Sequence, residues 1–86
     1  MSTTTNVYVA GLLFAVTDDE LRELGEQFGR VEKAKIIVDG DGKSRGFGFV
    51  TFAHAVDANR AIQALEGSMH RGRRLHAAPA TGKGAR

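Results

Sequence analysis

The spacing of apolar residues changes several times along the chain, and each change marks a new element. Residues 6–10 alternate around two valines and are rich in β-branched and aromatic types, which predicts a short strand. Thr17 followed three residues later by Glu20 has the spacing of a capping box, so a helix is predicted to begin there. Apolar positions then recur three and four residues apart until Gly29, which is predicted to end the helix.

The remainder of the chain continues with two strands, a second helix and a last strand. The two strands are separated by a turn cluster with two glycines, so they are predicted to form a hairpin. Gly67 is expected to end the second helix, and Pro79 is expected to close the last strand. The predicted elements are strands at 33–38, 46–52 and 74–78, a helix at 55–65 and a turn at 39–44.

The order strand, helix, strand, strand, helix, strand in so short a chain is typical of an α+β domain with ferredoxin-like βαββαβ topology. Such a domain has a four-stranded antiparallel sheet with two helices on one face, and right-handed crossovers place the first and third strands in the middle. We expect residues 6–80 to form this domain, with residues 1–5 as a flexible N-terminus and residues 81–86 as a flexible basic tail. The other face of the sheet is then open.

Composition limits the chemistry that the chain can perform. With 86 residues, of which 42% are apolar and 26% charged, it has room for one hydrophobic core. It has no cysteine, which excludes a disulfide framework, a thiolate metal site and a catalytic thiol. The longest apolar run, residues 12–16, is much shorter than a membrane span, so we expect a soluble intracellular protein with no membrane partner.

The net charge of +2 conceals two segments of opposite sign. Residues 17–32 contain six acids and two bases, whereas residues 68–86 contain five bases and no acid. Clustered arginines with a pI near 9.4 are typical of proteins that bind polyanions, although a solvated basic tail without a partner gives the same pattern. Charge alone leaves both interpretations open.

Strand alternation predicts which side chains occupy the open face. If Val7 and Val9 face the helices, Tyr8 points outward, and the same alternation turns Phe47 and Phe49 outward. Three exposed rings in a small domain invite aggregation unless something stacks on them. Nucleic-acid bases do so, each stack contributing about 1–3 kcal/mol, while neighbouring cations hold the phosphates. Basic residues expected on or at the rim of this face are Lys33, Lys35, Arg45, Arg74 and His76.

The three rings also allow other interpretations. The tail at residues 81–86 or a partner protein could cover them, or the strand register could be shifted by one residue so that they face the core. If the tail is not a lid, its two bases are expected to act as a mobile arm that contacts phosphates.

Two segments resemble the motifs of a known family. Residues 45–52 read RGFGFVTF and fit all eight positions of the octapeptide signature of the RNA recognition motif. Residues 7–12, VYVAGL, resemble the hexapeptide motif of that family. The resemblance runs from about residue 6 to residue 80, and the chain looks like the small stand-alone members of the family found in bacteria.

The resemblance implies a role for each residue of the two motifs. Tyr8 and Phe49 would be the main stacking residues, Phe47 would pack on a base or sugar, and Arg45 would contact phosphate. We therefore expect a monomeric, non-catalytic module that binds single-stranded RNA without a cofactor, with single-stranded DNA as an alternative ligand. A bacterial protein of this kind would be cytoplasmic, and any other would be nuclear or cytoplasmic.

Gly25 departs from the pattern of the family, which usually has Phe at that position on the core face of the first helix. The missing ring is expected to leave space in the core, so that Gly25→Phe would raise the melting temperature. Phe14 and Met69 are the side chains that could fill the space instead.

Other functions fit the sequence less well. The turn at 39–44, DGDGKS, resembles a calcium loop, but Ile37 and Gly48 stand where the first and twelfth ligands are needed. A phosphate loop would need glycine at residue 37. The three histidines lack metal-ligand spacing, so we expect no metal site. The main alternative is a protein–protein interaction module that uses the same sheet face, and a small phosphatase on this fold is a distant third.

Overall fold

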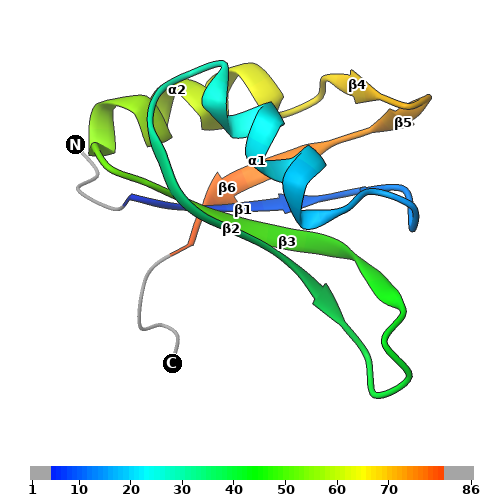
Figure 1. The fold of residues 1–86 in the computed structure, drawn as a ribbon. Helices are drawn as coiled ribbons and strands as arrows, with labels where there is room; N and C mark the ends of the chain where they lie inside the picture. The colour runs from blue at the N-terminus through cyan, green and yellow to red at the C-terminus, as the bar shows by residue number, and fades with distance from the viewer. Residues whose placement is uncertain (1–4, 81–86) are drawn as a thin grey trace.

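The computed structural model describes residues 5–80, so the expectations for the basic tail and for residues 1–4 lie outside the described residues. Figure 1 shows both helices on one face of a four-stranded sheet whose other face is open. The strands are antiparallel and lie in the order β2-β3-β1-β6, which confirms the predicted βαββαβ class. The elements are β1 (Asn6–Ala10), α1 (Asp18–Glu26), β2 (Val31–Val38), β3 (Ser44–Phe52), α2 (Ala55–Leu65), β4 (Met69–His70), β5 (Arg73–Arg74) and β6 (His76–Pro79).

The first helix begins where the sequence predicts and ends earlier. The hydroxyl of Thr17 accepts a hydrogen bond from the backbone N–H of Glu20 at 3.2 Å, which satisfies one of the free donors of the first turn. The helix ends at Glu26, three residues before Gly29. Packing explains the glycine at position 29 instead, because a Cβ atom there would collide with the carboxylate of Asp57 on α2. The turn after α1 therefore lies directly against the Asp57 side chain at the start of α2.

The hydrophobic core lies between the helices and the inner face of the sheet. Alternate residues of β1 and β3 supply its centre, as the strand pattern predicts. Neither helix is long and apolar enough to cross a membrane, at 9 and 11 residues. The core residues that are at most 1% exposed are Val7, Val9, Leu21, Val50, Phe52, Ala58, Ala61 and Leu75.

The space expected beside Gly25 is already filled, so that expectation is wrong. A Cβ atom at Gly25 would lie 2.9 Å from Val50 Cγ1 and 3.0 Å from Val31 Cγ2. The filling comes from these two branched side chains and from Phe52, whose Cζ would be 3.3 Å away. The larger exposed residues at 14 and 69 take no part in it. A larger residue at this position must therefore displace side chains of the sheet.

We therefore expect Gly25→Phe to lower the free energy of unfolding by about 1–3 kcal/mol or more, because a ring must be forced into a packed core. Gly25→Ala is the graded comparison. Its gain in helix propensity, about 1 kcal/mol, offsets much of the crowding by one methyl group. Chemical denaturation of the two variants measures the difference. A more stable Gly25→Phe variant would show that the core has room after all.

A two-stranded hairpin, β4–β5, follows α2 and is absent from the sequence prediction. Arg71 and Gly72 adopt φ values of 53° and 81°, as expected for the tight two-residue turn that joins such strands. Arg74 pairs with Met69 in this hairpin, and the sheet strand β6 begins only at His76. The predicted strand at 74–78 is therefore wrong at its start. Strands of two residues are too short to produce a recognisable alternation.

Each outer strand of the sheet has one backbone N–H occupied by a carboxylate. Asp18, in the first turn of α1, accepts a hydrogen bond from Ile36 N–H of β2 at 2.7 Å. Glu66, directly after α2, accepts one from Ala77 N–H of β6 at 2.8 Å. Free edge donors are the groups on which another strand adds, so these bonds disfavour edge pairing. They also fix both helices to the sheet and leave its open face free.

Candidate nucleic-acid interface

The open face is built from rows of residues that lie directly opposite one another on neighbouring strands. Val7, Val9 and Val50 are buried beneath it, so the predicted register is confirmed and the alternative shifted by one residue is excluded. The central row contains Lys35, Phe49, Tyr8 and Ala78, and the flanking rows contain Lys33, Thr51 and Asn6 on one side and Phe47, Ala10 and His76 on the other.

Three rings form a contiguous aromatic surface on the two central strands. The ring centre of Tyr8 lies 5.6 Å from that of Phe47 and 5.8 Å from that of Phe49. The two phenylalanines are 6.1 Å apart and nearly perpendicular, at 89°. All three side chains are partly exposed. Because β1 and β3 are the middle strands, the backbone beneath the rings is held on both sides. We call Tyr8, Phe47 and Phe49 the aromatic platform.

Two lysines lie on the outer strand β2, beside the platform. Lys35 is directly opposite Phe49 and Lys33 is opposite Thr51, and both side chains are exposed. Both side chains therefore border the open face on the β2 side.

Arg45 is exposed at the start of β3, next to the β2–β3 loop. The pKa of Asp39 in that loop is lowered from its ordinary value by hydrogen bonds from the N–H groups of Lys43 and Asp41 and, to a smaller extent, by the charge of Arg45. Arg45 therefore lies at the loop end of the platform, away from its centre.

The last two predicted cations occupy different places. His76 lies on β6 opposite Ala10, in the same row as Phe47, with its Nδ1 3.7 Å from a carboxylate oxygen of Glu66. Arg74 is exposed in the small hairpin, outside the four-stranded sheet. The structure thus brings His76 to the platform and leaves Arg74 beyond its end.

The pair Asn6 and Thr51 is a feature of this face that sequence reasoning missed. The Thr51 hydroxyl donates a hydrogen bond to the side-chain oxygen of Asn6 at 2.7 Å, across β1 and β3. Alternation predicts that Thr51 points outward, but only the register between the strands reveals its partner. The bond ties the two central strands together one row away from the rings.

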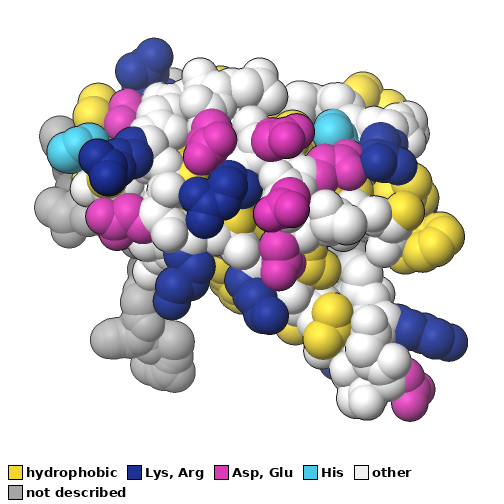
Figure 2. All heavy atoms as spheres, viewed as in Figure 1, with side chains coloured by type: hydrophobic (Ala, Val, Ile, Leu, Met, Phe, Trp, Pro, Cys, Tyr) yellow, Lys and Arg dark blue, Asp and Glu magenta, His cyan; other side chains and the backbone are white. Residues whose placement is uncertain are grey.

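The helix side of the molecule has the opposite charge. Figure 2 shows acidic side chains gathered over α1, on the face turned away from the platform. The acidic segment found in the sequence thus lies in one layer and the lysines of β2 border the other. The acids therefore lie mainly on the helix side, and the two lysines lie at the edge of the open face.

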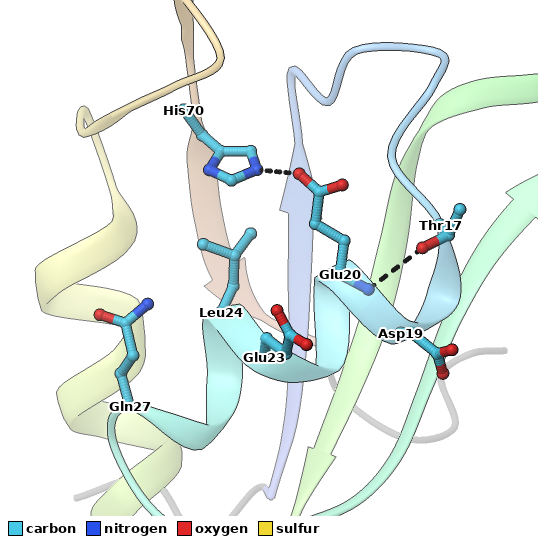
Figure 3. A pocket seen from close by; sticks show the side chains of 7 residues that line it. All are labelled: Thr17, Asp19, Glu20, Glu23, Leu24, Gln27 and His70. Atoms are coloured by element: carbon cyan, nitrogen blue, oxygen red, sulfur yellow. Dashed lines mark hydrogen bonds and ion pairs between the residues drawn. The ribbon is translucent and has the colours of Figure 1, made fainter.

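Glu20 joins the first helix to the small hairpin. Its carboxylate accepts hydrogen bonds from Arg71 Nε and a terminal Arg71 nitrogen at 2.7 and 2.8 Å, and it lies 2.6 Å from His70 Nε2. The bonds from Arg71, and then the contact with His70, hold the pKa of Glu20 below its ordinary value of 4.5. Figure 3 shows Glu20 bound at its backbone to Thr17 and at its carboxylate to His70. This carboxylate anchors the hairpin.

The same residues border a shallow hollow of about 370 Å³ on α1. Its wall includes Asp19, Glu20 and Glu23, so its charge is unsuited to a polyanion. Within residues 5–80, no group of three His, Asp or Glu side chains is arranged to hold a metal ion. We therefore consider the aromatic platform as the candidate binding site.

The lowered pKa of Glu20 predicts how acid affects the fold. A carboxylate with a depressed pKa stabilises the folded state above pH 4.5, and this stabilisation is lost as the pH falls through its folded pKa. We expect Glu20→Gln to be less stable than wild type at pH 7, with the difference shrinking as the pH falls from 4.5 through the lowered folded pKa of Glu20. Thermal melts from pH 7 to pH 3 test this, with Glu23→Gln on the same helix as control. An unchanged difference at low pH would contradict it.

The comparisons with known proteins agree with the fold and the face just described. The RNA recognition motif family model matches residues 7–76, so the chain belongs to this family of RNA-binding domains. Polyadenylate-binding protein 4 of Arabidopsis thaliana is 54% identical over 63 residues, which are 73% of this chain and 10% of that protein. The chain thus spans about a tenth of the length of this relative.

Solved structures of high similarity share the whole domain. The crystal structure of RNA Binding Protein PG1 is 40% identical with a TM-score of 0.84, and the match covers 92% of this chain and 94% of that one. A Sxl-lethal protein/RNA complex is 35% identical with a TM-score of 0.86, covering 92% of this chain and 48% of that one.

Proposed function

We propose that the open face of the sheet binds single-stranded RNA. Bases stack on Tyr8 and Phe49, and Phe47 packs against a base or a sugar. Lys33 and Lys35 hold the phosphates on the β2 side. Arg45 and His76 are proposed as further contacts at the rim of the platform, and Arg74 as a contact beyond its end. One copy of the chain acts by binding alone, without catalysis or a cofactor, and single-stranded DNA is the competing ligand.

The platform is the observation that carries this proposal. Three rings within 6.1 Å of one another remain partly exposed on the most constrained part of the sheet. Ala10 and Ala78, the neighbours of Tyr8 on its own strand and on β6, are too small to cover its ring. Flat bases fit such a surface because both of their faces are π-systems.

Oligoadenylate is the first RNA to test, because the similar Arabidopsis protein is named for polyadenylate binding. Direct titration of the chain with a fluorescent eight-nucleotide RNA measures affinity, and unlabelled DNA of the same sequence measures competition. Absence of RNA binding by the folded chain would refute the proposal, and capture of a protein on the same face would favour the alternative.

The salt dependence of this titration is our prediction for the cations. Neutralising three or four phosphates gives a slope of log affinity against log salt of about −2 to −3, since each contact on a single strand contributes about −0.7. Lys35→Gln is expected to reduce the slope by about 0.7. Arg60→Gln, which removes an exposed charge on α2, is the matched control and leaves the slope unchanged. A flat response in the wild type would indicate a ligand other than a polyanion.

A further inference from the structure

Phe14 is the most exposed large apolar residue among those that the structure describes. Its side chain is 77% exposed, although its neighbours Leu12 and Val16 are buried. A hydrogen bond from Val16 N–H to the carbonyl oxygen of Leu13, at 3.0 Å, closes a turn with Phe14 at its second position. The core therefore holds both ends of this turn, and the turn holds the ring out in solvent.

The ring borders a hollow shared with a second loop. Phe14 lines it together with Gly42 and Lys43 of the β2–β3 loop and with Ser44, the first residue of β3, and its volume is about 590 Å³. In Figure 1 the loop after β1 and the β2–β3 loop lie at the same end of the sheet. The hollow thus has an aromatic ring on one side and a lysine on the other.

On the lysine side of the hollow, the β2–β3 loop is closed by hydrogen bonds of Asp39. The Asp39 carboxylate accepts from Asp41 N–H at 2.8 Å and from Lys43 N–H at 3.0 Å, while Asp39 N–H donates to the carbonyl oxygen of Lys43 at 2.9 Å. The Asp39 carboxylate is therefore held by backbone donors of the loop, and a second acid, Asp41, is exposed beside Lys43. Lys43 itself is exposed.

The hollow lies beyond the Phe47 end of the aromatic platform, where β3 begins. Leu12 N–H donates to the carbonyl oxygen of Gly46 at 2.9 Å, which joins the loop carrying Phe14 to the start of β3. Going back along β3 from Phe47, the chain passes Arg45 and then reaches Ser44 in the wall of the hollow. A strand of RNA lying on the rings thus meets this hollow at the edge of the sheet.

We propose that Phe14 and Lys43 form an additional nucleotide subsite, in which the base stacks on the ring and the phosphate lies against the lysine. This inference rests on the proposed function and extends the bound RNA beyond the sheet. The combination of one flat ring and one cation matches a single nucleotide. A protein partner requires about 20–30 residues on each side, far more than the four that line this hollow.

Two lengths of RNA separate this subsite from the platform. Fluorescent oligoadenylates of three and eight nucleotides are titrated against wild type, Phe14→Ala and, as a matched control, Val56→Ala. Val56 is an apolar residue on α2 that is 62% exposed and lies on the helix side of the sheet. We expect Phe14→Ala to weaken the eight-nucleotide RNA about 5- to 100-fold and the trinucleotide less than twofold. Val56→Ala should leave both affinities within about twofold of wild type.

A scan with an abasic nucleotide identifies the base that Phe14 contacts. In the eight-nucleotide RNA, one base at a time is removed, and the loss of affinity is compared between wild type and Phe14→Ala. One terminal or near-terminal position should matter in the wild type and cease to matter in the variant. Unchanged affinity of Phe14→Ala for the longer RNA, or an equal loss for both lengths, would overturn the subsite. Failure of wild type to bind either RNA would instead refute the proposed function.

Discussion

The double variant Tyr8→Ala, Phe49→Ala is expected to lose about 2–6 kcal/mol of binding free energy for single-stranded RNA, the contribution of two base stacks, and to remain folded. Both rings lie on the open side of the sheet, so their removal leaves no cavity in the core. The remaining ring, Phe47, loses its two aromatic neighbours and keeps one stacking surface.

Titration with the eight-nucleotide RNA measures this loss, and circular dichroism and thermal melting of the same samples establish that the domain is folded. Met69→Ala is the matched control, because it removes an exposed apolar side chain from β4, outside the four-stranded sheet. A folded double variant that retains wild-type affinity would mean that the bases do not lie on these rings. Single variants that each lose half of the total would show that the two stacks are independent.

The sequence predicts most of this fold because its elements differ in period. The two helices and all four sheet strands are predicted from changes between alternation and helical spacing, although the last strand begins two residues later than predicted. The hairpin β4–β5 is not predicted because each of its strands has only two residues. Its turn also depends on a left-handed conformation of Arg71, which no sequence pattern indicates. For the same reason, Arg74 is predicted in the last sheet strand, whereas it lies in this hairpin.

The positions of the three platform rings can be predicted from strand alternation, whereas the contacts of the residues around them cannot. Alternation alone decides that Tyr8, Phe47 and Phe49 share a face once the valines between them are taken as core. The pairing of Thr51 with Asn6 depends on the register between strands 45 residues apart, which no local pattern records. Phe14 stands within a continuous apolar run, so only the fold separates it from its buried neighbours.

The prediction of space in the core beside Gly25 is wrong for a different reason. A missing large residue suggests a cavity only if the surrounding backbone is assumed to stay in place. Here the side chains of Val31 and Val50 lie about 3 Å from where a Cβ atom at residue 25 would be, so branched side chains of the sheet occupy the space. The sequence contains the glycine and both valines, but the distance between the two layers is a property of the whole core.

Gly48 is the position at which the smallest substitution is expected to have a large effect on the fold. It lies on β3 between the two phenylalanines of the platform, with its Cα facing the core. A Cβ atom there would be 2.5 Å from the carbonyl oxygen of Lys35 and 2.9 Å from Leu21 Cδ2. The first of these atoms belongs to the backbone of the paired strand β2, so a rotamer change cannot relieve the contact.

We therefore expect Gly48→Ala to lower the free energy of unfolding by about 2–4 kcal/mol, because β2 must move away from β3 or α1 must lift from the sheet. Displacement of β2 also moves Lys33 and Lys35 away from the rings, so the folded fraction should bind RNA more weakly than wild type. Urea denaturation measures the first effect, and titration under fully native conditions measures the second. Gly40→Ala makes the same chemical change in the β2–β3 loop, where no atom lies within 4 Å of the added Cβ, and should be nearly neutral. Equal stability of the Gly48→Ala and Gly40→Ala variants would show that the two strands can separate at little cost, and the lysines would then not be held in a fixed position beside the platform.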